Sequence, residues 1–328
     1  MKALRFHQYG PPSVLSMEDL PSPSIAPGDA LIQVKASSIN PSDIGIVAGR
    51  FKSPLPNTPG RDFAGVVVQD HVQGNGWEGK QVWGSGSGFG VTRPGAHAEF
   101  VVVPTMWLSE KPETLTMEQA AAIGVPYLAA WQSLVEVGQL QPDERILITG
   151  SNGAVGRAAT QLAHWRKAFV IGADITDAAT DADVFINLKQ KDLQTEIHAA
   201  TQGKLVDLVL DTVGASLFES CLRALRPGGR QIAIASAAKA QVEFNLVDFY
   251  HNQSRLFGLD TMKGTGPEIA ARMDQLRRLF DTGSLHAPAI QISDFASAVE
   301  VYTSVAERKT LEKQVLTMTG KPAGLERV

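Results

Sequence analysis

The sequence predicts an α/β protein in which a doubly wound parallel sheet, with helices on both faces, is joined to a β-rich domain. Residues 1–122 contain short β-prone runs, such as 30–36, 64–69 and 97–103, separated by proline and glycine. Beyond residue 122, strand-like runs alternate with helical patterns. Strands are expected at 145–150, 168–174, 184–188, 205–211, 229–235 and 255–260. This alternation is typical of a parallel sheet whose strands are connected by helices.

Length and composition narrow the function classes. The chain has 328 residues, which favours two domains at about 100–200 residues each. Its net charge is −4 without a basic block, so nucleic acid and anionic membranes are poor candidate partners. No apolar run approaches the roughly 20 residues that span a bilayer, and residues 1–7 lack a signal-peptide core. The only cysteine is Cys221, which excludes an intrachain disulfide, and we expect a soluble, cytoplasmic enzyme.

The most informative motif is Arg-Ile-Leu-Ile-Thr-Gly-Ser-Asn-Gly-Ala-Val-Gly at 145–156. A short strand leads into a turn with Gly150, Gly153 and Gly156, which opens a helical run. Glycine lets the backbone turn tightly and approach a ligand, and a helix N-terminus attracts a pyrophosphate. Asp174 ends the next strand, about 20 residues further on, where a Rossmann unit binds a ribose 2′-hydroxyl. The alternative is a tight strand-to-helix turn that binds nothing.

Three segments predict departures from simple alternation. Apolar residues at helical spacing predict a helix over 127–137. Only residues 175–183 separate the second strand from the third, whereas a full crossover needs about 10–12 residues, so its helix is expected to be reduced to a turn. The second half of 79–90 is too glycine-rich for a regular element and predicts a mobile surface loop, which could border a site or be a plain linker.

The C-terminal segment is expected to return to the first domain. It contains amphipathic helices over 269–280 and 296–305 and a last strand over 311–318, and its last ten residues look loose. The predicted domains are therefore 1–122 with 266–328, and 123–265.

In this plan the chain resembles the medium-chain dehydrogenases/reductases. The resemblance implies a GroES-like catalytic domain and a Rossmann dinucleotide-binding domain. Segment 121–131 resembles the zeta-crystallin-like quinone oxidoreductases most closely. The matching segments are 40–43, 59–65, 95–100, 121–131, 150–156, 207–214 and 225–230.

The resemblance also bears on whether the chain binds a catalytic metal ion. Zinc members of this family use a cysteine, a histidine and a second cysteine or an acid as ligands. Asn40 stands in place of the first cysteine, Arg61 and Asp62 replace a histidine–glutamate pair, and the region of Val125 offers no thiolate. Catalytic zinc needs about three protein ligands, so no metal is expected. Without a Lewis acid, the better hydride acceptors are quinones and carbon–carbon double bonds conjugated to a carbonyl.

Three residues are candidates for catalysis by this resemblance: Asn40, Tyr127 and Arg61. The Asn40 amide could bind the nicotinamide-ribose side or the substrate oxygen, or could cap a loop. The Tyr127 hydroxyl could donate to a developing oxyanion, or the ring could pack between domains. Arg61 could polarise a substrate oxygen, but we favour a structural pairing with Asp62 or Asp43.

Substrate contacts are implied at Val47 and Phe51, which flank the substrate cleft in the resemblance. They suggest an apolar or aromatic substrate, although both could belong to the core. His97 is more simply a packed histidine than a proton donor, and Cys221 a buried small residue. Ala129 stands where many relatives carry threonine, so one possible cofactor contact is absent.

The nicotinamide cofactor is expected to contact the glycine motif and the ends of neighbouring strands, with Ser236 beside its nicotinamide half. The expected contacts are Gly150, Ser151, Asn152, Gly153, Ala154, Val155, Gly156, Asp174, Asp211 and Ser236. Asp174 argues for NADH, because a carboxylate repels a 2′-phosphate. The resemblance argues for NADPH, which we favour here, with Arg157 and Lys189 as candidate phosphate ligands.

Together these features predict a zinc-independent oxidoreductase that transfers hydride from NADPH or NADH to a quinone or similar conjugated carbonyl. The alternatives are an enone, alkenal or enoyl-thioester reductase, and a non-catalytic NAD(P)H-binding protein of the same fold. A zinc dehydrogenase ranks below both. The expected partners are a small electrophilic substrate and a second copy of the chain, paired along the strand at 255–260.

Overall fold

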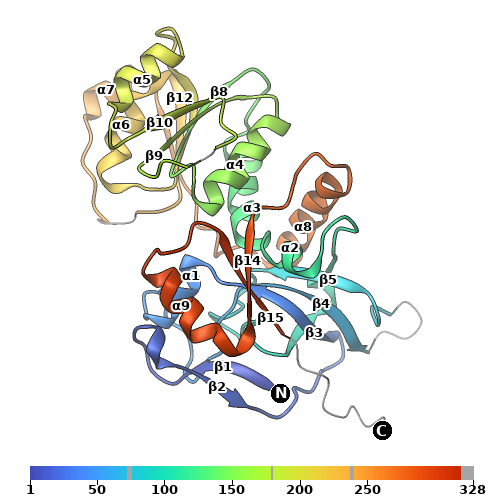
Figure 1. The fold of residues 1–328 in the computed structure, drawn as a ribbon. Coiled ribbons are helices and arrows are strands. Elements are labelled where there is room, and N and C mark those ends of the chain that lie inside the picture. Colours follow the sequence, from blue (N-terminus) through green and yellow to red (C-terminus); the bar gives the residue numbers. More distant parts are fainter. Residues whose placement is uncertain (72–75, 179, 237–239, 319–328) are drawn as a thin grey trace. The chain divides into compact units, whose positions relative to one another are not determined.

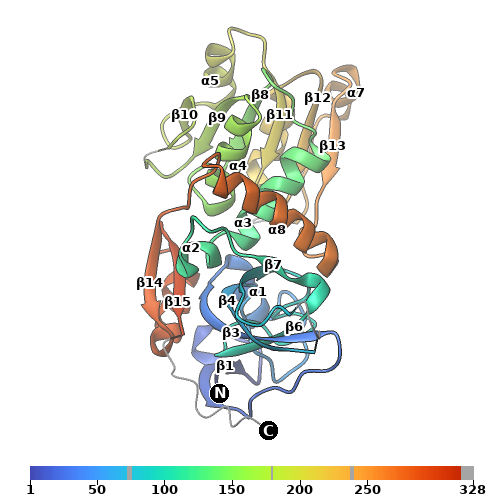
Figure 2. The ribbon, with the colours of Figure 1, turned by 90° about the vertical axis from the view of Figure 1, so that its right-hand side faces the viewer.

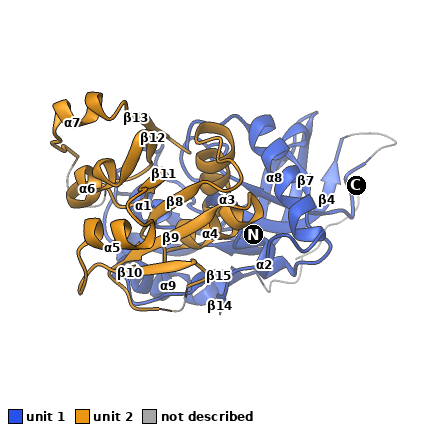
Figure 3. Cartoon of the chain, turned by 90° about the horizontal axis from the view of Figure 1, so that it is seen from above, with its two compact units in different colours: residues 1–125, 262–328 blue, residues 126–261 orange. Residues whose placement is uncertain are grey.

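The computed structural model describes residues 1–71, 76–178, 180–236 and 240–318 (Figure 1). The last ten residues, expected to be loose, lie outside this range. The chain divides into two compact units (Figure 3): unit 1 is Met1–Val125 with Met262–Val328, and unit 2 is Pro126–Thr261. Unit 1 therefore consists of two segments of the chain, and unit 2 of one.

Unit 2 is built on a six-stranded parallel sheet with the order β10-β9-β8-β11-β12-β13 (Figure 2). The chain runs outward from β8 to β10 and then returns to β11, so the strand order reverses between β8 and β11. Ligands of open α/β sheets bind at the carboxyl ends of the strands beside such a reversal. The strands are β8 (Arg145–Thr149), β9 (Phe169–Asp174), β10 (Val184–Asn187), β11 (Val206–Asp211), β12 (Leu225–Ala233) and β13 (Arg255–Gly258).

Helices cover both faces of this sheet. Helix α4 (Ala154–Trp165) packs against β8 and β9, on the opposite side from α5 (Leu193–Ala200) and α6 (Phe218–Arg223), as Figure 1 shows. A shorter helix, α7 (Leu246–His251), precedes β13. The described residues between β9 and β10 contain no helix, which confirms the reduced crossover. All six predicted strands and the doubly wound plan are confirmed.

The helix expected at 127–137 begins as α3 (Gly124–Trp131) and continues as a π-helical segment, Gln132–Val137. Within it the Ser133 hydroxyl donates to the Ala129 carbonyl at 2.7 Å, and Gly138 N–H donates to the Ser133 carbonyl at 2.7 Å. A serine side chain that bonds back to the preceding turn competes with the regular helical pattern, which is consistent with the wider turns here.

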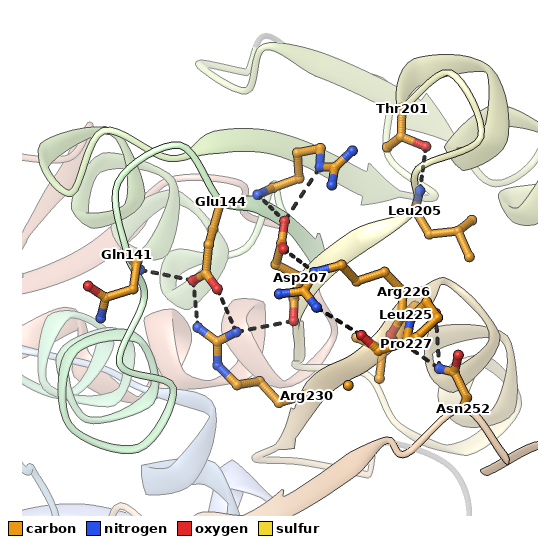
Figure 4. A network of polar contacts seen from close by, with 12 residues as sticks. Gln141, Glu144, Thr201, Leu205, Asp207, Leu225, Arg226, Pro227, Arg230 and Asn252 are labelled. Carbon is orange, nitrogen blue, oxygen red and sulfur yellow. Dashed lines mark hydrogen bonds and ion pairs between the residues drawn. The ribbon is translucent and has the colours of Figure 1, made fainter. Parts of the chain in front are cut away.

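A network of charged side chains closes the amino end of the unit 2 sheet (Figure 4). Arg230 binds both carboxylate oxygens of Glu144, at 2.9 and 2.6 Å, and also donates to the Gly138 carbonyl. Asp207 accepts hydrogen bonds from the Arg145 backbone and from the Arg226 guanidinium. Burial raises the pKa of Asp207, but these hydrogen bonds outweigh burial and lower it. The network is structural, because it lies at the end of the sheet away from the glycine motif.

Unit 1 contains a mainly antiparallel seven-stranded sheet of order β14-β15-β3-β4-β5-β7, in which β6 also pairs with β3, and a separate β1-β2 pair. The strand β15 pairs with β3, so the C-terminal segment completes the sheet that the N-terminal segment begins. The strands are β1 (Lys2–Phe6), β2 (Leu15–Asp19), β3 (Asp29–Ser38), β4 (Asp62–Asp70), β5 (Gln81–Ser85), β6 (Phe100–Pro104), β7 (Ser109–Glu110), β14 (Ile290–Asp294) and β15 (Lys313–Thr317).

Four α-helices of the described part belong wholly to unit 1: α1 (Pro41–Val47), α2 (Met117–Ala121), α8 (Gly266–Asp281) and α9 (Ala298–Ala306). Helix α8 confirms the amphipathic helix expected over 269–280 and buries Ile269, Met273, Leu276 and Phe280 on one face. In the described part of the chain, no helix is both long and apolar enough to cross a membrane.

The second half of 79–90 was expected to form a mobile surface loop, and this prediction is wrong. That segment is irregular, but Phe89 is only 2% exposed and packs edge-on against Phe63, with ring centroids 5.6 Å apart. Gly86, Gly88 and Gly90 all have positive φ angles. This left-handed backbone, which glycine adopts readily, lets the chain turn inward and bury the phenylalanine.

Candidate active site

The glycine motif forms a tight turn between β8 and α4. Gly150 has a φ of 61°, and the Gly153 N–H donates to its carbonyl at 3.0 Å. Gly156 lies against the same turn, because a Cβ there would approach Ser151 Cα to 2.6 Å. Helix α4 can therefore start this close to the turn only with glycine at this position.

The start of α4 is open to an anion. No side chain caps it, and its first turn contains no acidic residue. The N–H groups of Ala154, Val155 and Gly156 have no acceptor within the helix, as in the first turn of any α-helix. Two buried polar atoms, Ser151 Oγ and Asn152 Oδ1, have no hydrogen-bond partner among the described residues. Free N–H donors and these unpaired atoms fit a dinucleotide with its pyrophosphate at the helix N-terminus.

Asp174 fixes this loop to the end of β9. Its Oδ2 accepts from Asn152 N–H at 3.0 Å, and its Oδ1 accepts from Thr176 N–H at 2.9 Å. Asn152 also donates through Nδ2 to the Thr176 carbonyl at 2.6 Å. Each carboxylate oxygen can accept a second hydrogen bond, so Asp174 keeps the capacity to bind a ribose hydroxyl.

Asp211 has a different environment from the one expected of a ligand contact. Its carboxylate is 0% exposed, and Oδ1 accepts from Thr149 Oγ1, Val213 N–H and Gly214 N–H. These bonds join the carboxyl ends of β8 and β11. They hold the turn after β11 against the end of β8, and the expected cofactor contact at Asp211 stays a prediction.

Ser236 lies beyond the carboxyl end of β12 and is exposed. A Cβ on Gly214 would lie 2.9 Å from Ser236 Cα, so the turns after β11 and β12 are adjacent. The structure therefore places the glycine motif, Asp174 and Ser236 at the carboxyl ends of the strands of the unit 2 sheet.

Tyr127 is buried on α3, where its hydroxyl accepts a hydrogen bond from Gln161 Nε2 at 3.1 Å. Gln161 lies on α4, so this contact is within unit 2. Burial raises the pKa of the Tyr127 phenol, which the Gln161 hydrogen bond only partly offsets. A buried, bonded hydroxyl favours packing over donation to a substrate.

Asn40 precedes α1 in unit 1 and is 1% exposed. Its Nδ2 donates to Asp62 Oδ2 at 2.8 Å, and its Oδ1 accepts from the Lys313 ammonium. The backbone N–H of Asn40 donates to Asp43 Oδ2 at 2.8 Å. The Asn40 side chain therefore connects β4 to β15, and Asn40 is also the N-cap residue of α1, as its alternative as a capping asparagine predicts.

Asp62 lies at the centre of a buried cluster of polar groups that includes Asn40 and the other donors to its carboxylate. Its carboxylate is 0% exposed and accepts four hydrogen bonds. A Cβ on Gly124 would lie 2.6 Å from its Cγ, so glycine is required beside it. The donors are Ser38 Oγ (3.2 Å), Asn40 Nδ2 (2.8 Å), Ser85 Oγ (2.5 Å) and Val125 N–H (3.0 Å).

Arg61 is buried beside this cluster, and its Nη1 donates to Ser42 Oγ at 3.1 Å. In the described part of the chain it forms no ion pair with Asp62 or Asp43, so the favoured pairing is wrong in detail, although its charge acts on Asp43. Burial raises the pKa of Asp43 to about 6, opposed by the charges of Arg61 and Lys313. The Oδ1 of Asp43 is buried without a hydrogen-bond partner among the described residues.

The two expected substrate contacts differ in exposure. Val47 is buried in the unit 1 core, as its structural alternative predicts, whereas Phe51 is 40% exposed and lies against Gly45. The remaining candidates are structural. His97 accepts from the Tyr302 hydroxyl at Nδ1 (2.9 Å), and burial lowers its pKa to about 4, so it is a neutral, packed histidine. Cys221 is buried.

Two family models match this chain. The alcohol dehydrogenase GroES-like domain matches residues 26–113, and the zinc-binding dehydrogenase domain matches residues 154–277. A zinc-type alcohol dehydrogenase-like protein of Schizosaccharomyces pombe is 28% identical, over 97% of this chain and 98% of that protein. A quinone oxidoreductase of Pongo abelii is 29% identical, over 82% of this chain and 83% of that protein. The chain belongs to the medium-chain dehydrogenase/reductase family.

Solved structures of medium-chain dehydrogenases/reductases share the fold. An NAD-dependent alcohol dehydrogenase, 27% identical, has a TM-score of 0.87 over 97% of this chain and 100% of that chain. The Escherichia coli quinone oxidoreductase in complex with NADPH, 24% identical, has a TM-score of 0.85 over 97% of this chain and 100% of that chain. They confirm the expected Rossmann and GroES-like parts, and the quinone oxidoreductases among the relatives confirm an oxidoreductase enzyme.

Within this medium-chain dehydrogenase/reductase, the positions that correspond to zinc ligands in the resemblance meet at one carboxylate. Asn40 and Val125 both donate to Asp62, which follows Arg61 directly. No group of three or more histidine, cysteine, aspartate or glutamate side chains among the described residues could hold a metal ion. The sequence interpretation missed Lys313, Ser38 and Ser85. A lysine at the start of a buried last strand was the one available signal.

Proposed function

We propose that this chain is a zinc-independent reductase that uses a nicotinamide dinucleotide to reduce a quinone or a similar conjugated carbonyl. The observation that carries the proposal is the cluster around Asp62. Its carboxylate already accepts four hydrogen bonds, and its neighbours are amide, hydroxyl and ammonium groups, not thiolates or imidazoles. Zinc requires about three protein ligands, which these groups do not offer. The quinone oxidoreductases among the relatives support the substrate class.

Each site residue then has a proposed task. The N–H groups of Ala154, Val155 and Gly156, with the Ser151 hydroxyl, hold the pyrophosphate, and Asp174 accepts from the adenosine ribose. Asn152 and Asp211 fix the loop through its backbone. Ser236 contacts the nicotinamide half, and the reduced nicotinamide supplies the hydride when bound.

For the substrate, we propose that Asn40 donates a hydrogen bond to the carbonyl oxygen and that Phe51 offers an apolar contact. Arg61 and Tyr127 are retained as neighbours of the site rather than as catalytic residues, because the Arg61 guanidinium donates to Ser42 and the Tyr127 hydroxyl accepts from Gln161. Val47 is a core residue that supports α1. A proton from water completes the reduction.

For the cofactor, the local charge favours NADH over the NADPH that the resemblance suggests. The segment 168–188, which contains β9 and its following turn, has four aspartates and no lysine or arginine. A 2′-phosphate beside Asp174 would be repelled by its carboxylate, and Asp177 in the following turn adds to the negative charge there. Asp183 does not contribute to this effect, because it accepts from Val170 N–H near the start of β9. Lys189 is exposed after β10, and Arg157 donates through Nε to the Asn152 carbonyl at 3.0 Å. NADPH is the alternative if Lys189 reaches the phosphate.

The deciding experiment compares oxidation of NADH and of NADPH with a simple benzoquinone, in the presence of a metal chelator. Turnover that survives the chelator supports a zinc-independent reductase. Loss of turnover on chelation, regained with zinc, would overturn the proposal in favour of a zinc dehydrogenase.

The same assay separates the other candidate functions. Reduction of an enone, alkenal or enoyl thioester without benzoquinone turnover would assign a different substrate class. Nucleotide binding with no reduction of any of these would leave a non-catalytic binding protein of the same fold.

We also propose that two copies pair along β13. This strand is the last in the order of the unit 2 sheet, so one edge has no partner among the described strands. Apolar residues near it are exposed, including Leu246, Tyr250 and Leu256. Sedimentation equilibrium tests this pairing, and a monomer at all concentrations would exclude it.

The proposed compartment is the cytoplasm. The chain has a single cysteine, which is buried, and so does not depend on disulfides. With a net charge of −4, we expect small molecules and a second copy as partners, and not nucleic acid or membranes.

A further inference from the structure

We propose that Lys313 is a positioning residue for Asn40, holding and polarising its carboxamide so that the remaining Nδ2–H donates to the substrate carbonyl oxygen. The inference rests on the reductase function proposed above. It assigns a role to a residue of the last strand that neither the glycine motif nor the zinc positions indicate.

The first step concerns the orientation of the Asn40 amide. Lys313 carries only donors, so the atom it contacts must be the amide oxygen, and an ionised Asp62 carboxylate only accepts, so it must face the amide nitrogen. The two opposite charges therefore determine which way the amide points. Orientation of an asparagine usually has to be assigned from such a network, and here both ends agree.

The second step concerns the hydrogen bond that is left over. The Asn40 amide has two N–H groups, and Asp62 is the one acceptor for them among the described residues. Because Asn40 is 1% exposed, the second N–H has almost no access to water. A buried donor without an acceptor is unfavourable, which points to an acceptor supplied by a ligand.

The third step concerns charge. Lys313 is 8% exposed, and Asp62, Asp43 and Arg61 are the charged groups that act on it. Its ammonium draws electron density toward Oδ1 and thereby strengthens the N–H groups of the same amide as donors. Reduction of a quinone adds one hydride and one proton, and negative charge develops on a carbonyl oxygen as the hydride arrives. A donor oriented in advance stabilises that charge.

The fourth step concerns how Lys313 is held. It lies at the start of β15, where its ammonium also donates to the Ile39 carbonyl at 3.2 Å. Two residues further along, Val315 pairs with Ser38 in β3. The same strand pairing that completes the unit 1 sheet thus aligns the ammonium with Asn40.

The test compares Lys313→Met, Lys313→Arg and Asn40→Ala with the double variant Lys313→Met/Asn40→Ala. The expected result for Lys313→Met is a fall in kcat for benzoquinone of about tenfold or more, with an unchanged Kd for NADH. Lys313→Arg should restore most of the rate. In the Asn40→Ala background, Lys313→Met should lower kcat little further, because Lys313 acts through Asn40.

A matched control is Lys111→Met. Lys111 has the same exposed fraction, 8%, and among the described residues it donates to the Pro112 and Leu115 carbonyls alone. Its replacement should lower the thermal midpoint without changing kcat, which separates loss of any buried lysine from loss of this one.

The pH profile supplies a readout that a purely structural role would not change. Burial lowers the pKa of Lys313, although Asp62 and Asp43 oppose this. The kcat of the wild type should therefore fall at alkaline pH as the ammonium loses its proton. In Lys313→Arg this fall should be absent or shifted to higher pH, because guanidinium stays protonated.

Three outcomes would overturn the inference. A Lys313→Met protein that folds, binds NADH and keeps full kcat excludes the positioning role while the reductase function stands. Equal losses from Lys313→Met in the wild-type and Asn40→Ala backgrounds exclude action through Asn40. A wild-type chain that binds NADH and reduces no conjugated carbonyl overturns the function and this inference together.

Discussion

Lys313 donates a hydrogen bond to the side-chain oxygen of Asn40, although 273 positions separate them in the chain. The bond joins the two segments of unit 1 at the cluster around Asp62. The contribution of this bond to stability depends on burial. An ammonium or a carboxylate that is removed from water is unfavourable unless it is paired and hydrogen-bonded. The variants below test that compensation and the cofactor site separately.

Replacing Asp62 with alanine should strongly destabilise unit 1. Four donors would lose their acceptor, and the charge of Lys313 would lose its nearest balance. We expect a loss of about 3–5 kcal/mol in the free energy of unfolding, measured by urea denaturation. Ser38→Ala, which removes one donor, should cost only about 1 kcal/mol. Equal costs for the two variants would contradict the central role of Asp62.

Replacing Gly156 with alanine should weaken nucleotide binding at least about tenfold, because small displacements of anchoring backbone groups are costly. The new Cβ would approach Ser151 Cα to 2.6 Å and push α4 away from the loop. Fluorescence titration with NADH measures the effect. The control is Gly258→Ala, whose Cβ would meet no atom within 4 Å. An unchanged Kd in Gly156→Ala would argue against pyrophosphate binding at this turn.

Replacing Ile175 with arginine should raise the affinity for NADPH relative to NADH. Ile175 follows Asp174 directly and is 56% exposed, so a guanidinium there adds positive charge where the aspartates dominate. We expect the ratio of the two Kd values to shift about tenfold toward NADPH, as one added charge contact of about 1.4 kcal/mol would produce. Ile175→Gln provides a polar, uncharged control. A wild type that already prefers NADPH would refute the charge argument.

Stability between pH 4 and 6.5 should depend on two opposing groups. Burial raises the pKa of Asp43 from 3.8 to about 6, so the folded state binds the extra proton and stability falls as pH rises through this range. Burial lowers the pKa of His97 from 6.5 to about 4, so the unfolded state binds the extra proton and stability rises with pH. Each pKa shift corresponds to a change of about 3 kcal/mol in the free energy of unfolding across this pH range. The two changes have opposite signs and should largely cancel in the wild type.

Single variants separate the two contributions. In Asp43→Asn only the histidine remains, so the free energy of unfolding should rise with pH. In His97→Gln only the aspartate remains, and it should fall. Urea unfolding at several pH values measures both slopes, and parallel slopes in the two variants would contradict this assignment.

Much of unit 2 could be predicted from the sequence because its signals are local. Strands and helices alternate at regular spacing, and the glycine motif lies within one turn between β8 and α4. Gly153 and Gly156 lie against residues only a few positions away, Gly150 and Ser151, although a Cβ on Gly150 would meet Thr212 on the next strand connection. The short crossover before β10 could also be inferred by counting residues.

The rest depended on contacts that no local pattern contains. The strand β14 was missed because it has only five residues and none of them is buried, although Ile290 and Ile292 alternate with polar residues. The glycine-rich segment before Phe89 looked like a surface loop, yet it is packed inside. Arg61 was expected to pair with an acid but bonds to Ser42. Lys313 was recognisable only as a lysine at the start of a buried strand, and nothing local identified Asn40 as its partner.

The split of unit 1 also sets an order of events during translation. Unit 2 is one continuous segment and can fold as it leaves the ribosome, whereas β3 must wait for β15. Lys313 is made roughly 250 positions after Asp62, which at about 5–20 residues per second is a delay of about 10–50 s. Throughout that time the nascent chain carries both buried-site aspartates without their ammonium, so the N-terminal segment is the part most exposed to chaperones and proteases.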